Sequence, residues 1–398
     1  MQLVAMGAQD VYLTGNPQIT FFKVVYRRHT NFSKECIAQT FNGSVALGSS
    51  VSCTLSRNGD LVQEIYLKAV IGIETHATFA NEDFHRLEDM TNLIENVEVE
   101  IGGQKIDKHY SQWLDIYNEL FETSHDYRTV MSTKVNTTAE TSATSGTATV
   151  YLPLRFWFNR NPGLALPLIA LQYHEVKINL KINSAGNFFG VTSDSAANRD
   201  NAASVSDVTT PTADKVKLSL TSAELLVNYL YLDTDERRRF AQVSHEYLIE
   251  QVQHTGKETD ATIDMNFNHP VKALFWSGKK WDKVKLQLNG HDRAAEQGHD
   301  YYHLVQSYES GLGHSGKQMN GTRGWDTVTG GYVNTVSTVG MYSFCLKPAE
   351  HQPSGTCNFS RIDNARLNVT NAGDLYLFAL NYNVLRIMSG MGGLAYSN

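Results

Sequence analysis

Five short runs in which apolar and polar residues alternate constrain the fold of this chain more than any other feature. In each run an apolar side chain returns at every second position, which is typical of a strand that buries one face and exposes the other. Turn-forming residues separate the runs, and this spacing favours an antiparallel sandwich over a parallel sheet. The runs are residues 97–101 (VEVEI), 176–180 (VKINL), 216–220 (VKLSL), 284–288 (VKLQL) and 365–369 (ARLNV).

Two longer segments, residues 61–73 and 151–158, are predominantly apolar. They predict strands that are covered on both faces. Residues 111–123 predict one short helix that packs against a sandwich, because its apolar side chains form a single stripe at helical spacing. The stripe consists of Trp113, Ile116, Tyr117, Leu120 and Phe121.

Three stretches are rich in Ser, Thr, Asn, Ala or Gly and are too polar to form a core. We predict that they are exposed loops. They are residues 124–149, 183–215 and 309–340.

The chain also contains an internal repeat. Residues 94–103 match residues 281–290 at a spacing of 187, in a strand that ends at a glycine turn. Arg27, Arg28, Ser33 and Glu35 reappear as Arg238, Arg239, Ser244 and Glu246 at a spacing of 211. Two landmarks in the same order indicate two copies of one sandwich. We therefore predict an N-terminal arm at residues 1–25, a first domain at 26–235 and a second domain at 236–398.

The overall charge argues against a protein that coats nucleic acid. Lys and Arg number 34 against 41 Asp and Glu, which gives a net charge of −7, whereas phosphate binding requires a basic surface. The four cysteines form no C-x-x-C pair, which is ordinary usage for a reducing compartment. The N-terminal residues show no secretory signal pattern, so we expect synthesis and folding in a cytosol-like setting.

Two glycine-rich motifs resemble nucleotide-binding loops. Residues 311–317 (GLGHSGK) read as G-x-x-x-x-G-K, but Gln318 stands where a phosphate-binding loop has Ser or Thr. Residues 389–394 (SGMGGL) lack the surrounding strand–helix–strand unit of a dinucleotide site. We interpret both as structural loops, with a nucleotide binder kept as a minor hypothesis for the first.

Three histidine pairings suggest other chemistry. His299 and His303 have the spacing of metal ligands on a helix, yet no Cys or Glu cluster joins them. His174 beside Glu175, and Cys36 near His29, lack a third group that would orient a catalytic pair. We predict no catalytic residue, no cofactor and no metal site.

Surface contacts are better candidates for function. Arg suits paired charges at interfaces, so the arginine clusters are predicted to pair with carboxylates at a domain or subunit contact, with solvated loops as the alternative. The segment 19–26 (ITFFKVVY) either packs on its own domain or docks on a neighbouring molecule. The candidate contact residues are Phe21, Phe22, Arg27, Arg28, Arg237, Arg238 and Arg239.

Several long segments of the sequence resemble the major capsid proteins of nucleocytoplasmic large DNA viruses, in particular those of the algal-virus branch. They are long, and they follow the order of that family from one end of the chain to the other. They are residues 7–23 (GAQDVYLTGNPQITFFK), 26–32 (YRRHTNF), 101–110 (IGGQKIDKHY), 161–176 (NPGLALPLIALQYHEV), 232–237 (LDTDER), 352–364 (QPSGTCNFSRIDN) and 381–396 (NYNVLRIMSGMGGLAY).

The resemblance implies an all-β fold of two consecutive eight-stranded antiparallel jelly rolls with short connecting helices. It implies a structural protein, not an enzyme: a homotrimer of pseudo-hexagonal outline that tiles the icosahedral capsid of the virion. It further implies synthesis in the host cytoplasm, minor capsid proteins beneath the shell, an internal membrane and no direct contact with nucleic acid. Outer loops would carry glycans, with Asn136 and Asn320 as candidates. The alternative is a glycan-binding jelly roll, since lectins share this architecture.

Overall fold

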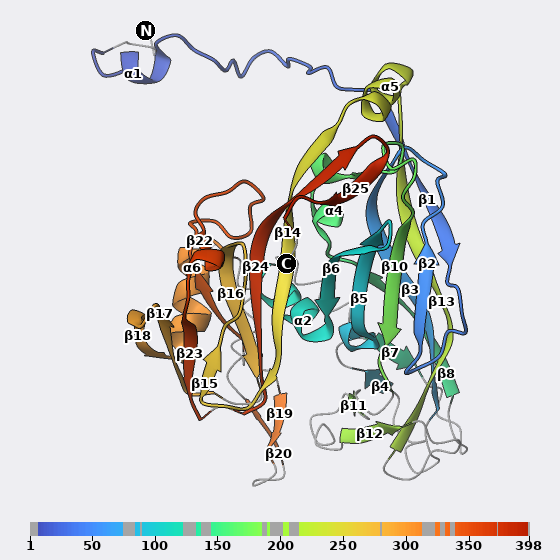
Figure 1. Cartoon of the computed structure of the whole chain (residues 1–398), viewed down its shortest axis with the longest axis vertical. Helices are drawn as coiled ribbons and strands as arrows, with labels where there is room; N and C mark the ends of the chain where they lie inside the picture. Colours follow the sequence, from blue (N-terminus) through green and yellow to red (C-terminus); the bar gives the residue numbers. More distant parts are fainter. Residues whose placement is uncertain are drawn as a thin grey trace, which may run out of the picture.

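The protein is built from β-strands arranged as two sandwiches side by side, with an N-terminal arm that extends away from them (Figure 1). This computed structural model describes residues 7–74, 84–87, 90–121, 133–136, 145–184, 189–191, 202–206, 215–278, 281–312, 323–326, 331–334, 339–371 and 373–396. All five alternating runs lie in strands, so these predictions are confirmed.

The first sandwich consists of a large sheet facing a four-stranded sheet. The large sheet contains the antiparallel order β1–β13–β3–β8, and the facing sheet has the order β2–β10–β5–β6. The strands are β1 (Phe32–Thr40), β13 (Lys215–Leu232), β3 (Leu61–Glu74), β8 (Ser145–Pro153), β2 (Ser50–Thr54), β10 (Val176–Ile182), β5 (Ile94–Ile101) and β6 (Gln104–Tyr110).

The second sandwich has the same construction. One sheet contains the order β14–β24–β16–β21 and the other has β15–β23–β17–β18. The strands are β14 (His245–Glu258), β24 (Leu375–Met388), β16 (Pro270–Gly278), β21 (Val339–Ser343), β15 (Thr262–Asp264), β23 (Ala365–Thr370), β17 (Lys283–Leu288) and β18 (His291–Gly298).

Eight strands in each sandwich therefore follow one another in the same order along the chain and across the sheets, as two copies of a single fold would. The two landmarks of the sequence repeat fall on equivalent strands. The landmark at a spacing of 187 relates β5 to β17, and the landmark at a spacing of 211 relates the start of β1 to the start of β14. Even the turn is shared: Gly102–Gly103 have φ of 58° and 84°, and Asn289–Gly290 have φ of 52° and 76°.

Short strands add to this frame, several of them within the predicted loops. β4, β7, β11, β12, β19 and β20 lie together at the lower end of the molecule in Figure 1, opposite the arm. They are β4 (Phe84–Leu87), β7 (Thr133–Asn136), β9 (Leu166–Pro167), β11 (Phe189–Val191), β12 (Ala202–Ser206), β19 (Arg323–Asp326), β20 (Gly331–Asn334), β22 (Cys357–Asn358) and β25 (Met391–Leu394). The predicted loops also overlap the start of β8 and of β21 and the end of α6, and most of their other residues lie outside the described part of the chain.

Helices are short and connect strands. The predicted helix is present as α2 (Ser111–Leu120). The others are α1 (Val11–Thr14), η2 (Met90–Leu93), α4 (Trp157–Arg160), η3 (Pro162–Leu164), α5 (Thr234–Gln242), the π-helix η5 (Tyr301–Val305), α6 (Gln306–Glu309) and η7 (Phe359–Arg361).

Two predictions about long apolar segments need correction. In β3 the inner residues, such as Ile65, Leu67 and Ala69, are fully buried, while the outer residues from Glu64 to Val70 are half-exposed because no layer from the described residues covers them. The segment 151–158 is not one buried strand: β8 ends at Pro153, Tyr151 is exposed, and the helical turn α4 begins at Trp157. Its apolar side chains instead close the end of the first core.

The shared turn gives a first prediction. Replacing Gly103 or Gly290 by valine should destabilise the fold by roughly 1–2 kcal/mol each, because a β-branched residue is strained at positive φ. No atom lies within 4 Å of a Cβ added at either position, so the loss reports backbone strain alone. Chemical unfolding followed by tryptophan fluorescence measures it. Gly298→Ala, at a position with ordinary φ, is the control, and equal losses in all three variants would contradict the argument.

Candidate assembly surfaces and the junction of the two sandwiches

Helix α2 lies between the two sandwiches and packs on both. It follows β6 directly, and Leu114 points into the core of the first sandwich. Trp113, Ile116 and Leu120 pack instead on the outer face of the large sheet of the second sandwich. There they meet Ala273 and Phe275 of β16 and Phe378 and Leu380 of β24, and the Trp113 ring lies 5.4 Å from that of Phe275. This apolar layer buries both faces of β16.

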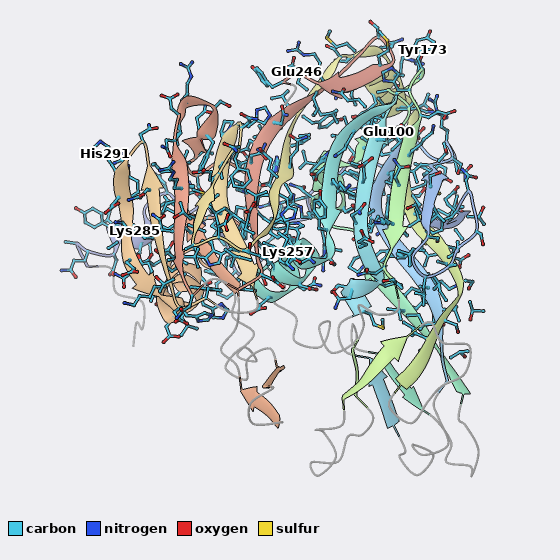
Figure 2. All side chains as sticks on the ribbon, turned by 60° about the horizontal axis from the view of Figure 1, so that its bottom comes forward. Glu100, Tyr173, Glu246, Lys257, Lys285 and His291 are labelled. Atoms are coloured by element: carbon cyan, nitrogen blue, oxygen red, sulfur yellow. The ribbon has the colours of Figure 1, made fainter. Side chains whose placement is uncertain are left out.

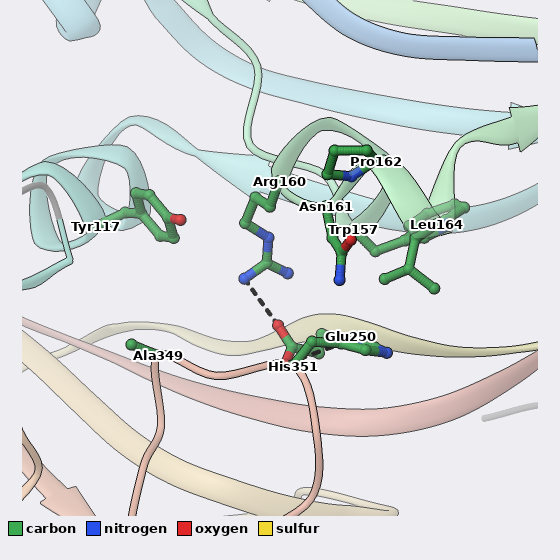
Figure 3. Close-up of a pocket in the computed structure, with 9 residues that line it drawn as sticks. All are labelled: Tyr117, Trp157, Arg160, Asn161, Pro162, Leu164, Glu250, Ala349 and His351. Carbon is green, nitrogen blue, oxygen red and sulfur yellow. Dashed lines mark ion pairs between the residues drawn. The ribbon is translucent and has the colours of Figure 1, made fainter. Parts of the chain in front are cut away.

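A buried ion cluster lies beside this layer (Figure 3). The Lys272 ammonium, with a fully buried side chain, is 2.5 Å from Glu250 Oε1 and donates a hydrogen bond to the Glu350 carbonyl at 2.8 Å. Arg160, from α4 of the first sandwich, approaches Glu250 Oε2 at 2.8 Å. One carboxylate thus receives a cation from each half of the chain.

Aromatic rings and a histidine surround the cluster. The Tyr117 ring lies 5.8 Å from the Arg160 guanidinium, and the Tyr382 ring lies 5.1 Å from the Lys272 ammonium. His351 completes the wall, and burial lowers its pKa, with Glu250 opposing this effect and Lys272 and Arg160 adding to it. The neutral imidazole therefore avoids a third positive charge beside one carboxylate.

Hydrogen bonds between β6 and β14 fix the register of the junction. The Val252 N–H donates to Asp107 Oδ1 at 3.1 Å, and Gln251 Nε2 donates to the Ile106 carbonyl. The ring of Tyr110 lies 4.7 Å from that of His254. Since these groups are buried or half-buried, sliding one sandwich along the other would leave several of them without partners.

The cluster gives a second prediction. Glu250→Gln should destabilise the protein by about 3 kcal/mol or more, because a buried lysine loses its counter-charge. Glu246→Gln, on the same strand, breaks only the exposed pair with Arg386 and should cost under about 1 kcal/mol. Denaturant unfolding measures both. The double variant Glu250→Gln/Lys272→Met should recover part of the loss, and no difference between the two single variants would refute the assignment.

The C-terminal hairpin accounts for two motifs that the sequence analysis singled out. Residues 389–394 are not a cofactor loop but the turn and strand β25 of a hairpin with β24. His174 Nδ1 lies 3.0 Å from the Gly392 carbonyl and 3.2 Å from its N–H. Tyr173 N–H donates to the Gly390 carbonyl at 3.0 Å, so the hairpin lies across the first sandwich.

The N-terminal arm contains the most exposed apolar side chains of the described chain. Phe22 is 100% exposed and Phe21 is 89% exposed, and their neighbours from Ile19 to Tyr26 are also exposed. Figure 1 shows the arm running away from both sandwiches. Of the two interpretations of segment 19–26, packing on its own domain is therefore absent from this structure. Arg27 and Arg28 are also exposed, in the stretch that leads from the arm to β1.

The second arginine cluster lies on α5, between the two sandwiches in the chain. Arg237 Nε is 3.1 Å from Asp60 Oδ1, a buried carboxylate that also accepts from the Leu232 N–H at 2.9 Å. Arg239 pairs with Glu236 one helical turn away, and Arg238 is exposed. The carboxylate partner of Arg237 thus belongs to the first sandwich, and a role in subunit contact stays a prediction.

Histidines 299 and 303 come close together but do not form a metal site. Their ring centroids are 5.6 Å apart, and His303 Nδ1 lies 2.9 Å from the Val339 carbonyl. The described part of the chain holds no group of three or more His, Cys, Asp or Glu suited to a metal ion. His299 instead lies against Trp281, with ring centroids 4.6 Å apart.

The other chemical candidates lie apart from any such cluster. Cys36 is exposed on β1 opposite Asn228, whereas His29 lies on the arm with Nδ1 2.6 Å from the Thr30 carbonyl. Residues 313–317 of the glycine-rich motif lie outside the described residues, as does Asn320. Asn136 is described only as the last residue of β7.

The environment of His299 gives a third prediction. Burial, assisted by His303 and opposed by Asp300, lowers its pKa to about 4, below the value of about 6.5 for an unfolded chain. Between these pH values the unfolded chain binds a proton that the folded chain excludes, so stability falls as pH falls from 6.5 towards 4. His299→Phe should reduce this loss, measured as denaturant midpoints at pH 7 and pH 5. Replacing the exposed His291 by Phe should leave the loss of stability between pH 7 and pH 5 unchanged. If both variants and the wild type lose stability equally over this range, His299 is not its origin.

Comparison with known protein families decides which of these features matter. The N-terminal domain model of major capsid proteins matches residues 20–233. The model described as "Large eukaryotic DNA virus major capsid protein" matches residues 236–283 and 331–393. The chain belongs to this capsid protein family. The family places it in the capsid of the virion.

Relatives align with the chain from end to end. The major capsid protein of Pyramimonas orientalis virus is 50% identical and that of Paramecium bursaria Chlorella virus 1 is 40% identical, each covering 100% of this chain and 99% of the relative. The solved VP54 of the latter virus (PBCV-1) matches with a TM-score of 0.70 and 36% identity, over 95% of this chain and 100% of VP54. The Faustovirus major capsid protein, at 13% identity and a TM-score of 0.66, shares the fold.

These matches confirm the double jelly-roll fold and the identification as a major capsid protein of a large DNA virus. They do not support the glycan-binding alternative, since the relatives are named as capsid proteins. Within the described chain, no helix combines the length and apolar character needed to cross a membrane.

The junction cluster was missed by the sequence analysis. Lys272 interrupts an otherwise apolar strand, PVKALFWSG, and a lone lysine in a strand buried on both faces needs a buried partner. The sequence therefore indicates that Lys272 has a buried partner. It does not identify that partner, because Glu250 and Arg160 belong to other elements and meet only in the folded chain.

Proposed function

We propose that this protein is a structural shell subunit, without enzymatic activity, that forms a homotrimer of pseudo-hexagonal outline. The observation that carries the proposal is the repeat of one eight-stranded sandwich within a chain of the capsid protein family. Three copies would place six similar sandwiches around one axis. Such trimers would then tile the icosahedral capsid of a large double-stranded DNA virus.

The chain is proposed to divide into an arm at residues 1–25, a first jelly-roll domain at 26–235 and a second at 236–398. The exposed helix α5 supports the second boundary, because it links the last strand of one sandwich to the first strand of the other.

The proposed partners are neighbouring trimers, minor capsid proteins beneath the shell and, inside it, a lipid membrane. The net charge of −7 supports a shell that does not contact the genome directly. We also propose synthesis in the host cytoplasm, and loops at the end opposite the arm as the outer, glycan-bearing surface, with Asn136 and Asn320 as candidate sites.

Native mass tests the proposed trimer. Protein expressed without viral partners should have a mass near three times 44.4 kDa by light scattering after size exclusion, and should keep it on dilution. A monomer that stays monomeric when viral lysate is added, with no hexagonal particles by negative stain, would overturn the proposal.

The arm is proposed to bind another subunit of the shell. Its apolar segment, including Phe21 and Phe22, is exposed to water, which is unfavourable in free energy. Binding to an apolar surface would remove this cost. Deleting residues 1–28 should leave the unfolding midpoint and the trimer unchanged, because the described part of this stretch, residues 7–28, contributes no buried side chain. The deletion should reduce association between trimers, and Phe21→Ser/Phe22→Ser should reproduce the effect. Unaltered lattice assembly by both variants would exclude this role.

A further inference from the structure

The internal repeat leaves two surfaces without the partners that their counterparts have. Inside the chain, the helix after β6 covers the outer face of the large sheet of the second sandwich. The second sandwich has an equivalent helical segment, η5 and α6 after β18, and the first has an equivalent sheet face on β13, β3 and β8. In the described parts of the chain, the helical segment keeps exposed apolar side chains and the sheet face is half-exposed.

The helical segment presents an apolar face, Leu304, Val305 and Tyr308, which we call the helix face. Tyr308 is 83% exposed, and the other two are also exposed. The spacing of 187 residues that relates β5 to β17 places Leu304 on Tyr117 and Tyr308 on Phe121. Tyr117 and Phe121 stack on each other at 4.9 Å and pack against the second sandwich, whereas Leu304 and Tyr308 are exposed. The equivalents of Ile116 and Leu120, His303 and Ser307, are already buried against β21 of their own sandwich, so the exposed part of the segment is limited to the helix face.

The sheet face consists of Tyr66, Tyr151 and Leu226. Tyr66 of β3 lies in register with Leu226 of β13, and Tyr151 of β8 is 51% exposed. Beside them Lys68 pairs with Glu224 at 2.5 Å. On β16 the equivalent outer face is buried under α2. The outer face of β3 combines Tyr66 and Val70 with the charged residues Glu64 and Lys68, a mixed surface that can stay in water until a partner covers it.

The two faces lie far apart on one molecule. In Figure 1, β17 and β18 form one side of the molecule, and β1, β13 and β3 form the other. Figure 2 places Lys285 and His291 on the same outer side of the second sandwich, remote from the labelled Glu100 of the first. A chain therefore cannot join its own two faces.

We infer that the helix face of one copy packs on the sheet face of a second copy, in a contact that repeats the junction inside the chain. Such a contact is heterologous, and three copies close it into a ring. The inference rests on the proposed trimer and assigns the residues of its interface. Tyr and Leu side chains on both faces suit an interface that forms from soluble chains.

Two single variants test the assignment. Tyr308→Asp and Tyr151→Asp should each raise at least tenfold the concentration at which the trimer dissociates, as measured by light scattering or analytical ultracentrifugation. Tyr173→Asp changes an equally exposed tyrosine on neither face and should leave the trimer intact. Thermal unfolding of each variant reports whether the sandwiches remain folded.

Mixing the two variants tests the pairing itself. The Tyr151→Asp protein keeps its helix face and the Tyr308→Asp protein keeps its sheet face. An equimolar mixture should therefore form pairs of about twice the chain mass at concentrations where each variant alone is monomeric. Failure of the mixture to associate would overturn the pairing.

Cross-linking provides a readout that does not depend on weakening the trimer. In a Cys36→Ser background, Tyr151→Cys/Tyr308→Cys should form covalent trimers on mild oxidation, and Tyr173→Cys/Tyr308→Cys should not. A wild-type trimer that neither aspartate variant weakens would overturn this inference and leave the proposed function standing. A wild-type monomer would remove the proposed trimer and the inference with it.

Discussion

The packing of α2 against the outer face of β16 and β24 is the contact on which the rest of the structure depends. A jelly roll needs cover only on the inner faces of its two sheets. Here the outer face of one sheet is apolar as well, with Phe275, Phe378 and Leu380. Only a second layer of protein protects that face from water, and the preceding sandwich supplies it. Two repeats thereby become one rigid unit.

Polar groups at the junction fix the relative orientation of the two sandwiches, which apolar packing alone would not specify. Glu250 is held between Lys272 of its own sandwich and Arg160 of the other. Removing three charges from water is costly, and apolar residues of similar size would often stabilise a core at least as well. The cluster is therefore better understood as fixing orientation. In the proposed trimer, the angle between the two sandwiches would determine whether three copies close into a ring.

Much of the fold could be predicted from the sequence, because strand periodicity is a local property. The alternating runs and helix α2 each depend on residues close together in the chain, and the repeat is found by comparing two such local patterns; all were present. The short strands β7, β11 and β12 fall in stretches that were predicted to be loops, since their pairing depends on distant partners and not on their own pattern. The apolar segment of β3 was predicted to be buried on both faces, and in a single chain only one face is.

The candidate surfaces were less predictable for a related reason. Exposure of Phe21 and Phe22 follows from where the arm runs, and composition could not decide that. The pairing of Arg237 with Asp60 joins residues far apart in sequence. The ion cluster at Glu250 involves three separate elements. Sequence reasoning identifies residue types suited to contacts, whereas their partners emerge only from the three-dimensional arrangement.

The difference between the two outer sheet faces follows from when each would be covered. The face on β16 and β24 is covered as the chain folds, so it carries phenylalanine and leucine that water never needs to solvate. The face on β3, β8 and β13 would stay wet until a second copy arrives. It carries tyrosines and the Lys68–Glu224 pair, which remain soluble before assembly and still bury apolar area afterwards. Equivalent positions of the two repeats thus differ in the expected way: the face that is covered during folding is apolar, and the face that would be covered only on assembly is mixed.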